Sequence, residues 1–215
     1  MTLTLTLIII VLTCAISLTA LSNGKLYNDL IFYPPSVTYQ NQWYRFFTCG
    51  LIHADYAHLL FNMYALYMFG NPVEKAFTSP ALYGEKGKIF YLVLYFSSLI
   101  VCLLPTYFKN KDNSYYRSLG ASGAVSAVIF VFIFLSPMSG MGLLFIPIQI
   151  PAFLFGFIYL GVSVYLDKRG QDNINHSAHF WGAVYGIAFL IITSYFFTDF
   201  RPVERFISQV TGYFR

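Results

Sequence analysis

The sequence predicts an all-α membrane protein, with residues 1–215 forming a single domain built as a bundle of six transmembrane helices. Two observations predict this fold class. Hydrophobic residues make up 57% of the chain and charged residues only 10%, whereas soluble domains carry roughly 25% charged residues. Long uncharged spans also recur along the chain, and a helix needs about 20 apolar residues to cross the hydrocarbon core of a bilayer. Both properties are typical of a multi-pass membrane protein.

The uncharged spans give the position of each helix in order. The predicted helices cover residues 1–21, 56–76, 88–107, 119–136, 146–166 and 177–197. The first has no basic residues ahead of its apolar run, so we expect a retained anchor rather than a cleaved signal peptide. The fourth and fifth come from one uncharged span that is too long for a single crossing. The sequence SPMSGMG at 136–142 divides this span, because proline and glycine favour turns.

Two aromatic segments lie outside these helices. Residues 22–55 carry many Tyr, Phe and Trp side chains, which prefer the headgroup level of a bilayer, so we expect this loop to be partly embedded. An ordinary extramembrane loop is the alternative. Residues 198–215 place their apolar side chains on one side of a helix, which predicts an amphipathic helix at the membrane interface.

Composition also excludes several classes of function. The net charge of +4 is spread over the chain without a basic run, so the sequence predicts no nucleic-acid partner. The cysteines at 14, 49 and 102 lie far apart and suggest neither a zinc site nor a disulfide framework. The HExxH motif of zinc metalloproteases is absent. We therefore expect no metal and no organic cofactor.

Polar side chains inside apolar segments are functional candidates, because burying them in a membrane is costly unless they are paired. His58 and Asn62 are four residues apart and share one face of the second predicted helix. Both can donate a hydrogen bond from a side-chain nitrogen. Two such donors could stabilise a negatively charged oxygen, although hydrogen bonds between helices would also account for them.

Small residues suggest that the fourth and sixth helices pack closely. Gly120 and Gly123 begin the fourth, while Gly182 and Gly186 follow His179 on the sixth. Small residues at this spacing let membrane helices approach each other, and plain packing would by itself explain them. The packing would also bring Ser122, which lies between the first two glycines, close to His179.

A serine beside a histidine is the nucleophile and base of acyl-transfer chemistry. Neutral imidazole can take the hydroxyl proton near pH 7. Glu74 is the only carboxylate within the predicted helices, and it lies near the end of the second, so the sequence favours a Ser122–His179 dyad over a triad. The Ser122 amide at a helix start, together with His58 and Asn62, could form an oxyanion hole.

Four motifs resemble those of the rhomboid family of intramembrane serine proteases. They are HLLFN at 58–62, GASG at 120–123, AHFWG at 178–182 and WYRFFT at 43–48. The first three match the family signatures HxxxN, GxSG and AHxxG in the family's order. In the last, Trp43 and Arg45 resemble the Trp-Arg element of the family's first loop. The resemblance covers essentially the whole chain.

The resemblance implies a rhomboid-like six-helix bundle with a defined catalytic site. Ser122 would be the nucleophile and His179 the general base, with His58, Asn62 and the Ser122 amide as the oxyanion hole. The site would lie in a water-filled cavity below the membrane surface. The partners would be the lipid bilayer and membrane proteins whose transmembrane segments are cleaved. The family's orientation places both termini in the cytoplasm, and we expect the cell membrane.

The sequence also departs from the family pattern. Ser126 stands where the family often has an aromatic side chain that packs on the catalytic histidine, so another aromatic would have to support His179. Tyr44 separates Trp43 from Arg45, which are usually adjacent. For His53 and His176, which have no assigned role, we expect positions at solvent or at a cavity rim.

Other classes of function remain open from the sequence. A transporter or channel would also place polar residues inside a helix bundle, although it should carry a ring or ladder of charges. A catalytically inactive relative that only binds transmembrane helices is a further alternative. A haem protein is another alternative, which visible absorbance of the purified protein would reveal.

Overall fold

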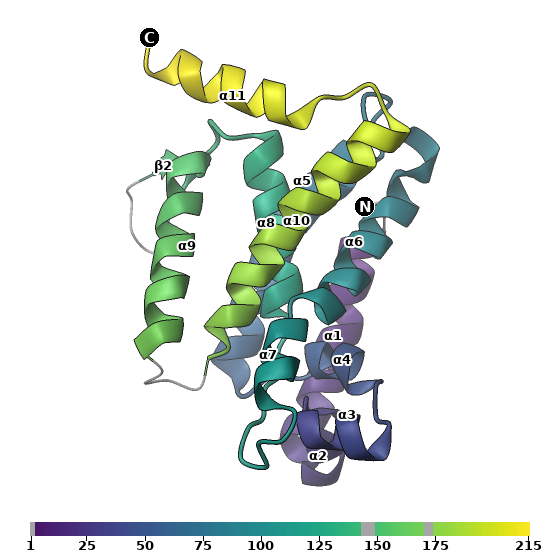
Figure 1. The fold of residues 1–215 in the computed structure, drawn as a ribbon. Helices are drawn as coiled ribbons and strands as arrows, with labels where there is room; N and C mark the ends of the chain where they lie inside the picture. The colour runs from purple at the N-terminus through teal and green to yellow at the C-terminus, as the bar shows by residue number, and fades with distance from the viewer. Residues whose placement is uncertain (1–2, 143–148, 170–173) are drawn as a thin grey trace.

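The computed structural model describes residues 3–142, 149–169 and 174–215, and this part of the chain is mostly helical (Figure 1). The helices are α1 Leu5–Ser22, α2 Gly24–Leu30, α3 Pro34–Gln40, α4 Arg45–Thr48, α5 Tyr56–Phe77, α6 Gly87–Val101, α7 Leu104–Asn110, α8 Ser122–Leu135, α9 Ala152–Arg169, α10 His176–Phe197 and α11 Pro202–Tyr213. Short 3₁₀ turns cover Cys49–Leu51 and Gly84–Lys86, and two short strands, β1 Gly140–Met141 and β2 Ile150–Pro151, pair antiparallel.

Helix α8 is the centre of the bundle. It contacts α5, α6, α9, α10 and α11, and ten of its 14 residues are buried. The short helices α2, α3, α4 and α7 gather at one end of the molecule, and α11 crosses the opposite end (Figure 1). The aromatic segment 22–55 is thus largely helical and contributes to a cap at one end of the bundle.

Side-chain caps fix where the site-bearing helices begin. The Asp55 carboxylate accepts the backbone N–H of His58 at 2.7 Å and starts α5. The Asn175 side chain accepts the backbone N–H of Ala178 at 3.1 Å and starts α10. Each cap satisfies an amide that the helix itself leaves without an acceptor. His58 and His179 therefore lie in the first turns of α5 and α10.

Proline explains two differences from the predicted helices. The predicted helix 88–107 is divided into α6 and α7 at Cys102–Leu103, because Pro105 lacks the amide that a continuous helix would need there. Of the predicted helix 146–166, residues 146–148 lie outside the described residues. The next residues include Pro151 in β2, and α9 begins only at Ala152.

Glu74 joins the start of α1 to α5. Its carboxylate accepts the backbone amides of Leu5 and Thr6, both at 2.9 Å, and the Thr6 hydroxyl at 2.8 Å. The same hydroxyl lies 2.8 Å from the Tyr91 hydroxyl on α6. A negative charge at a helix N-terminus is favourable, so these bonds compensate a buried carboxylate.

Large apolar side chains cover the outside of the bundle. Leu60 and Phe61 on α5, Phe157 on α9 and Phe196 on α10 are each more than half exposed. An apolar surface of this extent would be anomalous in water and is expected in lipid. The apolar helices therefore indicate an integral membrane protein.

Among the described residues, three segments are long and apolar enough to cross a membrane. They are Leu5–Ser22, Gly84–Asn110 and His176–Phe197. Helix α8 is apolar but has only 14 residues, which corresponds to about 21 Å at 1.5 Å per residue.

Candidate active site

Ser122 is the first residue of α8, and the turn before it depends on glycine. Gly120 has a φ of 106°, in the left-handed region that only glycine adopts without strain, and its amide donates to the carbonyl oxygen of Cys49 at 2.9 Å. The Ser122 amide lies in the first turn of α8, where the helix supplies no acceptor. The hydroxyl and the amide therefore lie at the positive end of a helix dipole, where negative charge is stabilised.

Helices α8 and α10 are in backbone contact beside Ser122. A Cβ added to Gly182 would lie 2.0 Å from the carbonyl oxygen of Gly123, and one added to Gly186 would lie 2.3 Å from the carbonyl oxygen of Ala127. A Cβ on Gly123 would lie 3.2 Å from the Ala178 carbonyl oxygen. The residue after Ser122 thus touches the residue before His179.

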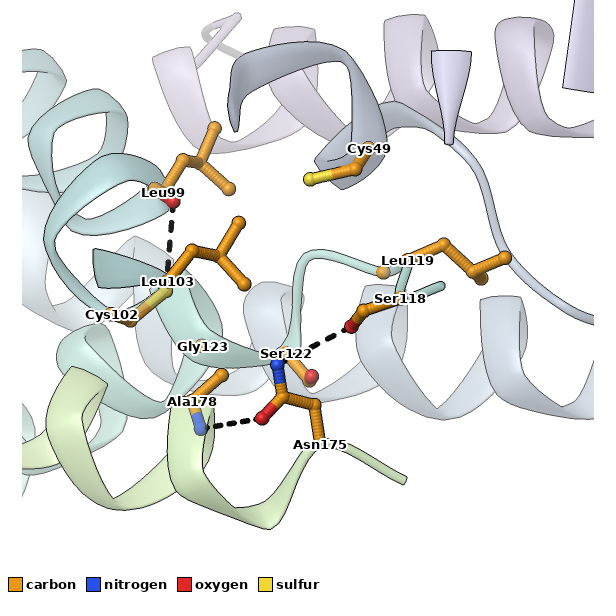
Figure 2. A pocket seen from close by; sticks show the side chains of 11 residues that line it. Cys49, Leu99, Cys102, Leu103, Ser118, Leu119, Ser122, Gly123, Asn175 and Ala178 are labelled. Atoms are coloured by element: carbon orange, nitrogen blue, oxygen red, sulfur yellow. Dashed lines mark hydrogen bonds between the residues drawn. The ribbon is translucent and has the colours of Figure 1, made fainter. Parts of the chain in front are cut away.

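Ser122 lines a small pocket that is formed by both polar and apolar residues from several elements (Figure 2). Asn175 lies beside it, donating to the Ser118 hydroxyl at 3.3 Å and accepting from the Thr106 hydroxyl at 3.1 Å. The pocket volume is about 10 Å³, close to the space of one water molecule. Asn175 was not a predicted site residue, although an Asn ahead of an apolar run is a recognisable helix-start signal.

Cys49 lines the same pocket but is a poor nucleophile. Burial raises the pKa of its thiol to about 12, so it stays protonated at neutral pH. A protonated thiol does not attack carbonyl groups effectively. The pocket also holds the Cys102 thiol, which donates to the Leu99 carbonyl oxygen at 3.7 Å, and the Ser118 hydroxyl. Ser122 is the candidate nucleophile among them because its hydroxyl lies at the start of α8.

His58 lies against the turn that precedes Ser122. A Cβ on Gly120 would be 3.0 Å from its Nε2. Its Nδ1 accepts the Ala54 amide at 3.4 Å, so in the neutral ring Nε2 carries the proton and can donate. The predicted packing of Gly120 against the sixth helix is replaced here by packing against this imidazole.

Asn62 is buried one turn after His58. Its Nδ2 donates to the backbone carbonyl oxygen of His58 at 3.0 Å. An amide nitrogen carries two hydrogens, so this bond leaves the second one for another acceptor.

His179 lies in the first turn of α10, supported on two sides by rings. The Tyr159 ring of α9 stacks on it, with centroids 6.2 Å apart and planes at 27°, and the His176 ring meets it edge-on at 5.6 Å. All three residues line a cavity of about 490 Å³ that is mostly apolar. Sequence reasoning required an aromatic support for His179 but did not identify Tyr159.

The prediction for His53 was wrong. It is fully buried, with its Nδ1 3.3 Å from the Ser17 hydroxyl and its ring 4.9 Å from the His58 ring. Burial lowers the pKa of His53 to about 3, and the neighbouring His58 contributes to the shift. A neutral imidazole can be buried where a charged one cannot. His176 is also buried, but it lines the cavity next to His179.

Trp43 and Arg45 organise the cap at the end of the bundle. The buried Arg45 guanidinium donates to the carbonyl oxygens of Asn28 at 2.9 Å and Ile31 at 2.6 Å. The Trp43 ring stacks on Phe46 with a centroid distance of 6.0 Å. Neither side chain lines the pocket of Ser122 or the cavity of His179.

Comparison with known proteins gives a consistent set of relatives. The chain is 32% identical over 142 residues to RHOMBOID-like protein 12, mitochondrial, of Arabidopsis thaliana, covering 63% of this chain and 42% of the relative. It is 33% identical over 94 residues to the candidate rhomboid protease YdcA of Bacillus subtilis (strain 168), covering 44% of this chain and 42% of the relative. It is 30% identical over 169 residues to Rhomboid-like protein 11, chloroplastic, of Arabidopsis thaliana, covering 72% of this chain and 54% of the relative.

The matched region thus spans about half, or less, of each of these relatives. The family model of the rhomboid domain matches residues 40–196, which include the motifs around His58, Ser122 and His179. Because this match covers most of the chain, the protein belongs to the rhomboid family.

Proposed function

We propose that the chain is an intramembrane serine endopeptidase that hydrolyses a peptide bond in or near the transmembrane segment of a membrane protein. The observation that carries the proposal is the backbone contact between α8 and α10. A Cβ added to Gly182 would lie only 2.0 Å from the Gly123 carbonyl oxygen, so there is no room for one. The first turns of both helices therefore lie side by side. Ser122 and His179 each belong to one of these turns.

The proposed reaction is acyl transfer through a serine–histidine dyad. His179 takes the Ser122 proton as the hydroxyl oxygen attacks the substrate carbonyl. The negative charge that develops on the carbonyl oxygen is stabilised by the Ser122 amide and by donors from His58 and Asn62. The amine product leaves with a proton from His179, and water then hydrolyses the acyl-enzyme. No metal or organic cofactor takes part.

Substrate selection follows from the chemistry of a helix. Backbone carbonyls in a transmembrane helix are engaged in hydrogen bonds, so the substrate must unwind locally before attack. We expect it to enter sideways, between α5 and α9, and to carry glycine or proline near the cleavage site. Both residues weaken a helix.

We also propose six membrane crossings, formed by α1, α5, α6 with α7, α8, α9 and α10. The resulting single domain over 1–215 would include the partly embedded loop 22–55 and the interfacial tail 198–215. Because α8 spans only about 21 Å, its start at Ser122 would lie below the membrane surface, within reach of water. Both termini would be cytoplasmic.

The proposed location is the cell membrane. Three matched relatives are named as mitochondrial or chloroplastic proteins and one comes from a bacterium, so membrane fractionation of the native host is the appropriate test. Recovery in the plasma-membrane fraction would support this location, and recovery in an organelle fraction would overturn it.

The proposal is tested by cleavage of a model single-span substrate in liposomes. Wild type should cleave it, whereas Ser122→Ala and His179→Ala should not. Ser136→Ala, at the other end of α8, is the matched control and should cleave like the wild type. Cleavage by Ser122→Ala at the wild-type rate would remove the nucleophile assignment, whereas absence of cleavage by the wild type would favour a transporter or helix-binding role.

A further inference from the structure

Ser126 and Tyr159 form a hydrogen-bonded pair beside the candidate dyad, at a position where the sequence departs from the family pattern. Ser126 lies one turn after Ser122 on α8 and is only 2% exposed. Its hydroxyl is 2.6 Å from the Tyr159 hydroxyl on α9. The bond connects two helices at the level of the candidate site, and it determines where one end of the Tyr159 ring lies.

The face of the Tyr159 ring supports His179. The two rings are nearly parallel, at 27°, and 6.2 Å apart, within the distance range in which offset aromatic rings attract. Phe130 of α8 contacts the same tyrosine ring at 5.6 Å. The tyrosine therefore connects three helices: its hydroxyl is bound on α8, its backbone belongs to α9, and its ring lies against α10.

A histidine that acts as a base needs such a support. The second side-chain torsion of histidine has broad minima, so packing around the ring must set the direction of its nitrogens. Stacking occupies the face of the ring and restrains its rotation, whereas a proton is accepted at the ring edge, in the plane of the nitrogens. The hydrogen bond from its hydroxyl to Ser126 in turn restrains Tyr159 from shifting relative to the imidazole.

We propose that Tyr159, anchored by Ser126, is a positioning residue that orients the His179 imidazole toward Ser122. This inference rests on the proposed protease function. The geometry of the dyad, which lies on α8 and α10, would then depend on a residue of α9. Any movement of α9 would therefore change how well the base is aligned.

The test compares kcat and KM for cleavage of a single-span substrate in liposomes. Tyr159→Leu removes the ring and should lower kcat by about 10- to 100-fold, since small misplacements of reacting groups have effects of this size. KM should stay within about twofold, because the ring orients the base rather than holding substrate. The matched control is Tyr165→Leu, an exposed tyrosine on the same helix, which should behave like the wild type.

The hydrogen bond between the Ser126 and Tyr159 hydroxyls is tested separately, with variants that keep the ring. Tyr159→Phe and Ser126→Ala should each lower kcat by only about fivefold, the effect of one hydrogen bond. The double variant should lose no more than either single variant, because both changes remove the same bond. Tyr159→Phe should keep most of the activity that Tyr159→Leu loses, because it keeps the ring that orients the base. Melting temperatures of both variants show directly whether any lost activity comes from loss of folding instead.

Two results would overturn the inference while leaving the proposed function intact. One is a wild type that cleaves through Ser122 together with a Tyr159→Leu variant of unchanged kcat. The other is a loss of kcat in Tyr159→Leu accompanied by additive effects of Tyr159→Phe and Ser126→Ala. If Ser122→Ala itself cleaves at the wild-type rate, the proposed function and the inference both fall.

Discussion

Gly182 offers the most direct perturbation of the contact between α8 and α10. Alanine at this position would place its Cβ 2.0 Å from the Gly123 carbonyl oxygen, and the closest atoms are all backbone. An ordinary contact begins at 3.4 Å, so the helices must separate by 3.4 − 2.0 = 1.4 Å or tilt to the same effect. Forcing extra atoms into a packed core costs about 1–3 kcal/mol.

Because Ser122 belongs to α8 and His179 to α10, the displacement of one helix from the other separates the proposed dyad. A shift of about 1 Å between reacting groups can cost on the order of 100-fold in rate. We therefore expect Gly182→Ala to lower kcat about 100-fold and to reduce the free energy of unfolding by about 1–3 kcal/mol. The assay is substrate cleavage in liposomes together with thermal unfolding in detergent.

Gly161→Ala is the matched control for this change. Gly161 lies in α9, and an added Cβ would meet nothing within 4 Å. This variant should keep wild-type activity and gain up to about 1 kcal/mol from the higher helix propensity of alanine. If Gly182→Ala cleaves substrate as fast as Gly161→Ala and unfolds at the same temperature, the reasoning from helix contact is refuted.

Three further predictions address the other buried groups. Glu74→Gln should lower the free energy of unfolding by about 1–3 kcal/mol, because the Glu74 carboxylate accepts three hydrogen bonds. The control Glu204→Gln, at an exposed position, should not lower it. Equal melting temperatures of the two variants would contradict this. For His53, a folded pKa of about 3 means that only the unfolded chain gains a proton as the pH falls below about 6.5. Stability should therefore drop by about 2 kcal/mol from pH 7.5 to pH 5, and His53→Gln should lack this part of the pH dependence; identical pH curves would disprove it. Asn62→Ala should lower kcat about 100-fold with little change in KM, measured from initial rates; an unaltered kcat would exclude it from the oxyanion hole.

Close helix packing was predictable from the sequence because glycine spacing reports it directly. Gly182 and Gly186, at positions three and seven after His179, follow one face of α10, and both lie against backbone of α8. Gly120, by contrast, was expected to pack on the sixth helix, but it adopts a φ of 106° in the turn before Ser122 and lies against His58.

Contacts between distant segments were not predictable. Tyr159 is 33 residues from Ser126, and nothing in the local pattern of α9 shows that its hydroxyl reaches α8. His53 was expected at solvent or at a cavity rim because it lies near a helix end, but Ser17 of α1 provides a buried partner. Tertiary packing overrides such local rules. The number of membrane crossings also does not follow from hydropathy alone, because α5 carries polar residues and α8 is short.

The proposed activity depends most on Ser122 being a nucleophile activated by His179. Reaction with a fluorophosphonate probe, followed by mass spectrometry of the labelled peptide, measures this directly in the full chain. We expect the probe to modify Ser122 in the wild type, and we expect His179→Ala to abolish the modification while Tyr165→Leu does not. A label on another residue, or a Ser122 label of equal yield in His179→Ala, would contradict it.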